Sequence, residues 1–406
     1  VRAPLLLLLT LLLLISAQLV PLPPTVWENL PGRDLYAQIM ETAGLGLQWQ
    51  PLSLSPSKTL NSLFSLSVPL AALLLFAVQG RKYVRPTVVA IVLLGALSSF
   101  WGLLQLIGSS TGPLYLYRIT NPGLPVGLFA NRNHQAVVLA ALIPCLAYVA
   151  FTAASRSRRG DLERFGMLFL ALVFVTTVLM TGSRAGLLSL VIGCAGAAVI
   201  GLGRRADPQV NHKRRRLSRR PILVVALLAL VVLAGVMAAW FGRALAIERL
   251  FATDHVEDAR AQLTPILAHM AGFFFPAGSG FGSFEHVYDR FEPLYLLKEQ
   301  YLNQAHNDWL QLLIEGGLPA LAILLVSLLW LGRHAWLTWT MRNSADSGRR
   351  ALRIASLFFI LTLGFASLFD YPLRVPSVMA MLAIFCAVLA RTGQAGKVGA
   401  PGPVHV

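Results

Sequence analysis

Long apolar runs separated by polar connections constrain this chain more than any other feature of its sequence. Most of the runs contain about twenty residues, the length of helix that crosses the hydrocarbon core of a bilayer. The 406 residues are 56% hydrophobic and only 13% charged. The runs do not alternate apolar and polar residues, as the strands of an outer-membrane barrel do. We therefore exclude a soluble enzyme and a barrel. Ten runs are counted, at residues 4–20, 60–79, 86–108, 134–154, 166–181, 185–203, 221–242, 317–337, 352–369 and 376–390.

The predicted fold class is all-α, a polytopic transmembrane helical bundle of about ten spans. Only the tight turn TGSRAG, at residues 181–186, separates the fifth run from the sixth. Because the chain begins with Val1 rather than methionine, we allow for a truncated N-terminus. The three cysteines, Cys145, Cys194 and Cys386, lie inside apolar runs without CxxC spacing. We expect them to be small buried side chains and predict no metal site.

Basic residues set the orientation of the predicted bundle. A cytoplasmic N-terminus brings the segments RKYVR, SRSRRGDLER, RRADPQVNHKRRRLSRR and RNSADSGRRALR to one face, as the positive-inside rule requires. That face and both tails then hold 23 of the 34 Lys and Arg residues and 4 of the 18 Asp and Glu residues, which leaves 11 basic and 14 acidic residues elsewhere. Membrane orientation thus explains the formal charge of +16 better than a nucleic-acid-binding patch at HKRRRLSRR, so no nucleic-acid partner is predicted.

This topology divides the chain into three regions. Residues 1–125 are predicted to form N-terminal transmembrane helices and an extended cap, residues 21–59, on the outer face. Residues 126–390 form the main membrane domain, whose largest loop, 243–306, contains helices and lies on the same outer face. Residues 391–406 form a flexible cytoplasmic tail rich in Gly and Pro.

Polar groups gather at the outer ends of several predicted spans. Arg184 lies in a turn too short to carry it far into water, so it needs a partner or an anionic ligand. His306 stands where a polar stretch gives way to an apolar run, and alone it is equally well explained as an interfacial histidine. We expect both to converge at one membrane boundary with further residues, which are Asn131, Arg132, Asn133, His134, Arg260, Asn307, Asp370 and Arg374.

Some of these charged residues have simpler explanations. For Arg132 we favour snorkelling to lipid headgroups. Asp308 and Glu315 lie at the start of an apolar helix, where the helix dipole favours carboxylates. Asp370 is expected either to orient an arginine or to form an ion pair with Arg374, and the sequence does not separate these two roles.

The glycine-rich run PAGSGFGSF is a further candidate for substrate binding. Its glycines, Gly278, Gly280 and Gly282, could present backbone N–H groups to a phosphate. The run follows no strand and lacks the lysine of a P-loop, so nucleotide binding is not expected and an ordinary turn is favoured.

Four spaced motifs together resemble the O-antigen ligase family of bacterial membrane proteins. They are GLFANRNH, MTGSRAGLL, ARAQLTPILAHMAGFFFPAGSGFGSFEHVY and QAHNDWLQLLIEGGLPAL. The resemblance extends over residues 126–376 and is densest over 257–321. The histidine–asparagine pair followed by a helix with a Glu-Gly-Gly break is its most specific part.

The resemblance implies a metal-independent glycosyltransferase in the bacterial inner membrane, without a cofactor and with its active site at the periplasmic face. Its donor would be an undecaprenyl-pyrophosphate-linked glycan, and its acceptor lipid A-core or another glycan. Arg184 and Arg260 would hold the donor's pyrophosphate, and His306 would be the catalytic histidine. The predicted substrate-binding residues are Asn131, Asn133, Asn307, Asp370, Arg374 and Gly280.

A neutral imidazole can accept the proton of an attacking sugar hydroxyl, and fixed guanidinium groups can stabilise a pyrophosphate leaving group. Because no second carboxylate is obviously paired on the outer face, we expect direct displacement with inversion. A polysaccharide polymerase that extends lipid-linked repeat units is a close alternative. Transfer to protein hydroxyls and transport of a lipid-linked glycan are less favoured, since nearly all charges lie at helix ends rather than near the bilayer midplane.

Overall fold

The computed structural model describes residues 1–46, 48–110, 112–154, 157–205, 255–297, 302–341 and 346–392. Helices are the main regular structure of these residues and strands are nearly absent, which confirms the all-α fold class. The strands described are two-residue segments, β1 (Pro21–Leu22) and β2 (Gln50–Pro51), paired antiparallel. Helices coincide with nine of the ten predicted runs, and the tenth, 221–242, lies outside the described residues.

The described part of the chain supports six membrane spans rather than about ten. Helices α1 (Arg2–Ala17) and α16 (Pro376–Thr392) are apolar but shorter than the spans. Helix α15 (Ser347–Ala366) carries three arginines in its first two turns, which leaves a shorter apolar stretch. The six candidate spans are α4 (Pro56–Ser65) continued by α5 (Ser67–Val78), η1 (Arg81–Tyr83) continued by α6 (Val84–Ile107), α7 (Arg132–Phe151), α8 (Arg158–Thr181), α9 (Arg184–Arg205, apolar to Leu202) and α14 (Asp308–Thr340).

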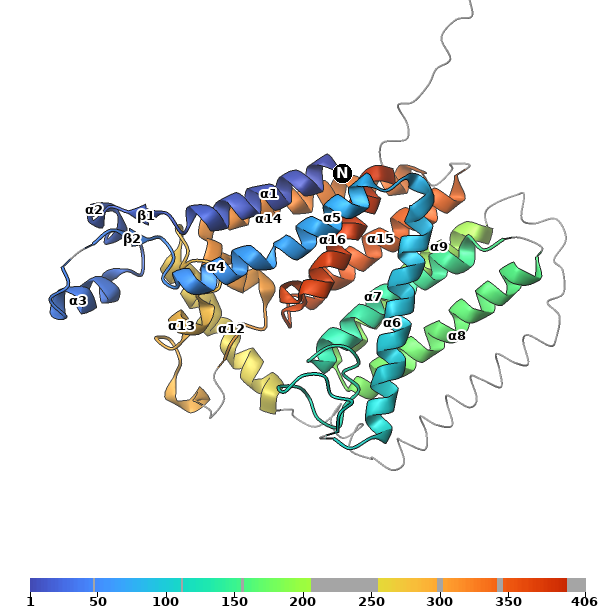
Figure 1. Cartoon of the computed structure of the whole chain (residues 1–406), viewed down its shortest axis with the longest axis horizontal. Helices are drawn as coiled ribbons and strands as arrows, with labels where there is room; N and C mark the ends of the chain where they lie inside the picture. The colour runs from blue at the N-terminus through green and yellow to red at the C-terminus, as the bar shows by residue number, and fades with distance from the viewer. Residues whose placement is uncertain are drawn as a thin grey trace, which may run out of the picture.

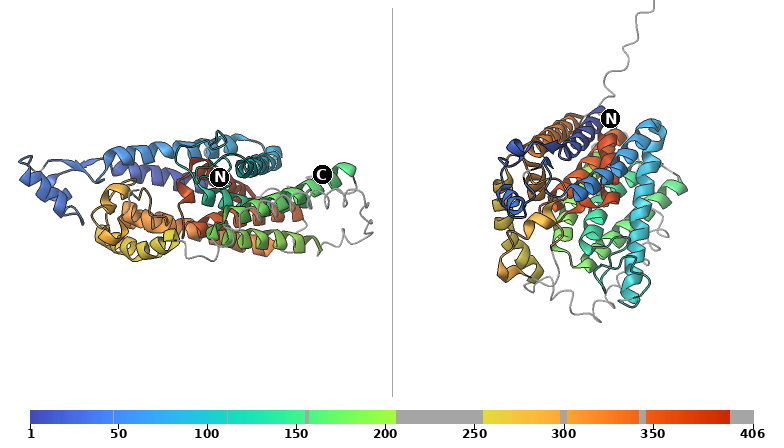
Figure 2. Two further views of the ribbon diagram at one scale, coloured as in Figure 1. Left: turned by 90° about the horizontal axis from the view of Figure 1, so that it is seen from below. Right: turned by 60° about the vertical axis from the view of Figure 1, so that its left-hand side comes forward.

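Helix α7 forms the centre of the bundle. It packs against α6, α8, α9 and α15, and 83% of its most apolar stretch is buried inside the protein. Its small and aliphatic side chains belong to the largest hydrophobic cluster, together with residues of α5, α6, α15 and α16. Figures 1 and 2 show α7 enclosed by these helices. Both faces of the helix are therefore covered, which explains why its apolar residues run on without helical periodicity.

A second group of helices is built around α14, which packs against α1, α12 and α15. At the end of the molecule where α14 begins, the cap segment and the long loop lie together (Figure 1). The cap segment contains α2 (Pro24–Trp27) and α3 (Asp34–Thr42), and the loop contains α12 (His255–Phe274), α13 (Phe284–Tyr288) and η3 (Leu294–Leu296). The predicted helices within this loop are thus present. Its periplasmic location stays a prediction, and residues 393–406 of the predicted tail lie outside the described residues.

The buried Arg33 joins the cap segment to the loop. Its guanidinium donates hydrogen bonds to the carbonyl oxygens of Pro31, Leu52 and Gly278, and its side chain is fully buried. Burial lowers the pKa of Arg33 to about 10. Three carbonyl acceptors compensate for the loss of water around this charge. The cap segment is therefore anchored to the loop, and it folds into short helices rather than remaining extended.

A break in α14 explains why two of the sequence motifs occur together. Gly317 has φ 57° and ψ −145° in the middle of the helix. The loop after α12 packs into this break, where the N–H of Leu318 donates to the carbonyl of Pro276. A Cβ atom on Gly317 would lie 2.1 Å from that carbonyl oxygen. Glycine is required here both for its backbone conformation and for the close approach of the loop.

Candidate active site

His306 lies immediately before α14, in a backbone conformation that few side chains adopt. Its φ is +50°, and among the described residues other than glycine it is the one with positive φ. Asn307 caps the helix, since its side-chain oxygen accepts hydrogen bonds from the N–H groups of Trp309 and Leu310. Left-handed backbone at a histidine costs of order 1–3 kcal/mol and often occurs at functional sites. The His306 side chain is 18% exposed, so substrate can reach it.

Asp370 holds the imidazole of His306. The Nδ1 atom of His306 lies 3.2 Å from Oδ1 of Asp370, whose side chain is fully buried. The same carboxylate accepts hydrogen bonds from Nδ2 of Asn133 at 2.8 Å and from the N–H of Tyr371 at 2.9 Å. The Nε2 atom of His134 lies 3.8 Å from Oδ1. Arg374 pairs with Asp308 and Glu315, so the ion pair between Asp370 and Arg374 is not observed in the described structure. Orientation of an arginine by Asp370 stays a prediction.

This pairing determines which nitrogen of His306 is free for chemistry. An ionised carboxylate only accepts hydrogen bonds, so contact with Asp370 places the proton of a neutral imidazole on Nδ1. The lone pair on Nε2 is then available to accept a proton from a substrate. The ring of Tyr371 contacts the imidazoles of His306 and His134 edge-on, with centroid distances of 4.9 and 5.0 Å. The arrangement thus fixes both the tautomer and the direction of the His306 ring.

The first turn of α7 connects this histidine site to the turn that carries Arg184. Asn131 caps α7 by accepting the N–H of Asn133. Arg132 donates to the carbonyl of Thr181, 3.3 Å away in the turn between α8 and α9. Arg184 opens α9 just beyond this turn. One helix end thus holds Asn133 against Asp370 and Arg132 against the α8–α9 turn. Snorkelling of Arg132 to lipid headgroups stays a prediction.

Arg260, the other predicted catalytic arginine, lies on α12, but its side chain is outside the described residues. Convergence of Arg184 and Arg260 with His306 therefore stays a prediction. Two of the predicted substrate-binding residues, Asn131 and Asn307, have an observed role as helix caps.

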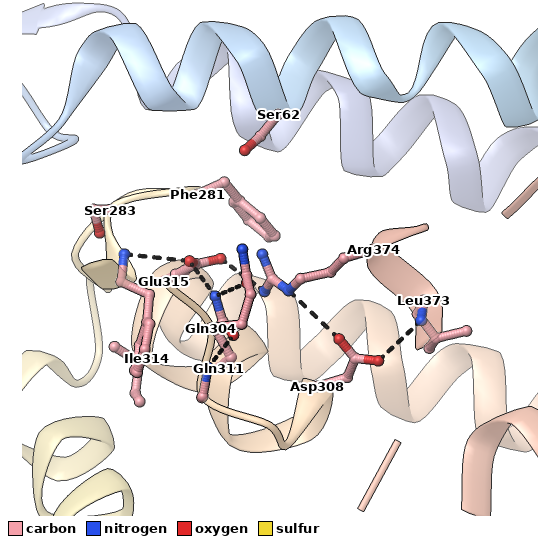
Figure 3. A network of polar contacts seen from close by, with 12 residues as sticks. Ser62, Phe281, Ser283, Gln304, Asp308, Gln311, Ile314, Glu315, Leu373 and Arg374 are labelled. Carbon is pink, nitrogen blue, oxygen red and sulfur yellow. Dashed lines mark hydrogen bonds and ion pairs between the residues drawn. The ribbon is translucent and has the colours of Figure 1, made fainter. Parts of the chain in front are cut away.

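Arg374 belongs to a second polar cluster, with Asp308 and Glu315 (Figure 3). It lies on η5 (Pro372–Arg374), and its Nη2 donates to Oε2 of Glu315 at 2.9 Å. Its Nε lies 3.4 Å from Oδ1 of Asp308. Burial lowers the pKa of Arg374, but the two carboxylates outweigh this effect and the net pKa is raised. The arginine therefore stays charged, and both carboxylates do more than interact with a helix dipole.

Glutamine side chains complete this cluster. Gln311 is fully buried and donates to both Oε1 of Glu315 and Oε1 of Gln304, at 2.9 and 2.8 Å. Its own oxygen accepts the N–H of Ala305. This cluster was not predicted from the sequence. Residues 308, 311 and 315 are spaced by three and four, which places them on one face of a helix, and this spacing was the signal that could have revealed it.

Phosphate binding would require a backbone N–H group of Gly280 that is not already hydrogen-bonded within the protein. This N–H group donates to the carbonyl oxygen of Glu315 at 2.9 Å. The N–H groups of Ser279 and Phe281 are also occupied, by the carbonyl of Ile314 and the side chain of Gln18. The loop therefore holds the bent part of α14 in place, and a substrate contact from Gly280 is not visible in this arrangement.

No group of three or more His, Cys, Asp or Glu side chains that could hold a metal ion occurs in the described ranges. Cys145 is buried and Cys386 partly buried, as expected, whereas Cys194 is exposed on α9, contrary to the expectation of a buried thiol. Metal independence stays a prediction.

Comparison with known proteins adds an independent finding. The model of the family described as O-antigen ligase matches residues 168–325, a range that begins in α8 and ends in α14. None of the curated proteins matches the chain. The matched range contains Arg184, Arg260 and His306, and with the apolar helices it leads to one conclusion. This chain is a multi-pass membrane protein whose residues 168–325 match the O-antigen ligase family.

Proposed function

We propose that this protein transfers a glycan from undecaprenyl diphosphate to a hydroxyl group of an acceptor, lipid A-core, at the periplasmic face of the bacterial inner membrane. The observation that carries the proposal is the contact between His306 and the buried Asp370. A histidine whose ring is fixed by a carboxylate and whose other nitrogen is available is suited to accept a proton. The match to the O-antigen ligase family supports a glycosyltransferase of the ligase or polymerase type.

In the proposed reaction, His306 takes the proton of the acceptor hydroxyl through Nε2. The hydroxyl oxygen forms a bond to the anomeric carbon of the donor sugar while the bond from that carbon to the diphosphate breaks. The diphosphate leaves on its lipid with the bonding electrons. Asp370 stabilises the imidazolium that forms, because its carboxylate faces the protonated ring.

The leaving group would be held by arginines. Diphosphate gains negative charge as the bond breaks, and fixed guanidinium groups can form bidentate hydrogen bonds to it. Arg184 and Arg260 are proposed for this role, and Arg132 lies against the same α8–α9 turn. The N-terminus of the 20-residue α7 also points its positive dipole end toward this region. These charges would supply the stabilisation for which other enzymes use a metal ion.

A single displacement with inversion is proposed. A covalent glycosyl intermediate would need a free carboxylate as nucleophile. Around His306, the carboxylate in contact is Asp370, which is fully buried and accepts hydrogen bonds from Asn133 and Tyr371. It is therefore placed to orient a base rather than to attack a sugar.

Reconstitution of the purified protein with an undecaprenyl-diphosphate glycan, with and without lipid A-core, tests the proposal directly. Products would be followed on gels for wild type, for His306→Ala and for a control, His286→Ala, which alters an exposed histidine on α13. We expect transfer to lipid A-core that is lost in His306→Ala and retained in the control. A lengthened lipid-linked glycan without lipid A-core would instead identify a polymerase. Transfer by His306→Ala would remove the base assignment.

Two further measurements test the proposed binding of the diphosphate. Arg184→Lys keeps the charge but removes the planar pair of donors, so transfer should fall. Wild-type transfer by this variant would argue against bidentate contacts. Addition of a chelator should leave transfer unchanged, and inhibition would show that a metal ion takes part.

A further inference from the structure

A large crevice borders the segment 303–309, and neither His306 nor Asp370 is among the residues that line it. Its volume is about 1010 Å³, and it is bounded by α1, α4, α5, α14, α15 and α16. The segment presents Gln304 and Asp308 to the crevice, while His306 between them contacts Asp370. Figure 3 shows Ser62 on the helix opposite the Arg374 cluster, with Phe281 between them.

The crevice is long, and most of its lining is apolar. Leu11 of α1, Leu324 of α14 and Leu382 of α16 are among the side chains that line it. Along α14 the lining extends from Asp308 to Leu331. At about 1.5 Å per residue, and with the break at Gly317, this corresponds to roughly 30 Å, which is the thickness of a bilayer's hydrocarbon core. The shape therefore suits the apolar chain of a lipid.

The polar end of the crevice does not suit an anionic headgroup. Its two cations are each already paired, Arg374 with Glu315 and Asp308, and Lys58 with Glu285 at 2.9 Å. Taken together, these three carboxylates and two cations carry a formal charge of −1. A phosphate, which only accepts hydrogen bonds, would meet carboxylates that also only accept.

Hydroxyl groups match the same lining well. A hydroxyl donates one hydrogen bond and accepts others, so it can bind both to carboxylates and to amides. The polar end offers the side chains of Gln304, Asn303, Asn61 and Ser62 beside Asp308. Trp309, fixed by a hydrogen bond from its Nε1 to the carbonyl of Gly364, adds an aromatic surface.

We infer that this crevice is a binding site for a lipid with an uncharged, hydroxyl-rich headgroup, a glycolipid, whose apolar chain lies along α14 and whose sugar contacts Gln304 and Asp308. Arg184, which is proposed to hold the donor's diphosphate, is not among the residues that line the crevice. The crevice ends on the segment that carries His306, so a bound glycolipid has its sugar beside the proposed transfer site. The inference concerns binding and does not require that transfer occurs.

Photolabelling of the full chain in phospholipid nanodiscs tests this site. The probe is dodecyl maltoside with a diazirine in its alkyl chain, used below its micellar concentration, and labelled peptides are identified by mass spectrometry. We expect labelling of α1 and α14, reduced at least fivefold by excess unlabelled dodecyl maltoside. The same excess of phosphatidylglycerol or phosphatidylethanolamine should reduce it less than twofold.

A matched pair of variants on α14 locates the probe. Ser327 lines the crevice, whereas Leu329, two residues further on, is 74% exposed and is not part of the lining. Ser327→Trp should reduce labelling at least fivefold, and Leu329→Trp should leave it unchanged. Equal competition by phosphatidylglycerol, or unchanged labelling in Ser327→Trp, would overturn the inference. The competition experiment uses the wild-type protein, so it does not depend on the folding of a variant. Neither the competition nor the labelling of the variants requires glycan transfer, so failure of His306-dependent transfer would leave both results unaffected.

Discussion

The two polar clusters on either side of the segment 303–309 use similar residues in different ways. On one side, Asp370 orients His306, and the imidazole keeps one nitrogen available. On the other side, Arg374 is held by Asp308 and Glu315, so its charge is compensated within the protein. The histidine cluster thus fits the proposed proton transfer, whereas the arginine cluster fixes the start of α14.

This difference shows why the type of residue is a weak guide to its role. Arg374, Asn131 and Asn307 are polar groups at a helix end, as His306 is, yet the structure gives them partners within the protein. The four predictions below test whether catalysis and stability separate between the two clusters.

The largest expected effect is on catalysis, from Asp370→Asn. An amide can donate to Nδ1 and so favour the wrong tautomer of His306, which removes the base from Nε2. Transfer should fall by about 10²–10⁴-fold, the usual contribution of a general base. Initial rates in the reconstituted system measure this, with Asp346→Asn, an exposed carboxylate, as the control. A variant with full activity would show that Asp370 does not position the base.

Glu315→Ala should act mainly on stability. Loss of this buried partner leaves Arg374 with one carboxylate and should cost about 3 kcal/mol of the free energy of unfolding. Thermal unfolding in detergent should give a clearly lower Tm. The control is Asp34→Ala, which removes an exposed pair with Arg290 and should cost less than about 1 kcal/mol. Equal melting of the two variants would contradict the structural role of the arginine cluster.

Gly317→Ala should destabilise the join between α14 and the loop after α12. The new Cβ would collide with the carbonyl of Pro276, and alanine is disfavoured at this φ. We expect a cost of about 2 kcal/mol, seen as a lower Tm. Gly332→Ala on the same helix, where a Cβ meets nothing within 4 Å, should instead be neutral or stabilise by up to about 1 kcal/mol. If Gly317→Ala left the Tm unchanged, the break in α14 and the loop after α12 would not be coupled through this close contact.

The smallest effect is expected from Asn131→Ala. Loss of a helix cap costs about 1 kcal/mol, and Asn131→Ser should restore most of it, because serine also caps helices. If capping is the whole role of Asn131, the KM values for donor and acceptor should not change in either variant. A raised KM in both would return Asn131 to the substrate-binding residues.

Local sequence features correctly predicted where the helices lie. They were less reliable in predicting which of these helices have the length and composition of a membrane span. Nine of the ten apolar runs coincide with helices, because an apolar stretch of this length is stable as a helix whatever it packs against. The run 352–369 shows the limit. Two arginines precede it within α15 and a third, Arg353, lies inside it, so the described helix falls short of the composition of a span.

The candidate site was predicted as a set of residues but not as a set of contacts. His306 and Asp370 are 64 residues apart, and Asn133 and Asp370 are 237 apart. No local pattern connects such positions. Of the two roles left open for Asp370, the ion pair with Arg374 is not observed, because Arg374, although near in sequence, contacts Asp308 and Glu315 instead.

The sequence by itself determined a helical membrane protein, because chain length and hydropathy act locally on each span. The orientation that the basic residues indicate stays a prediction. The sequence also identified the motifs shared with the O-antigen ligase family. Only the tertiary structure decided that Asp370 holds His306, that Glu315 and Asp308 hold Arg374, and that a crevice runs along α14. The physical reason is that buried charges must find partners, and packing of distant helices determines which partners they meet.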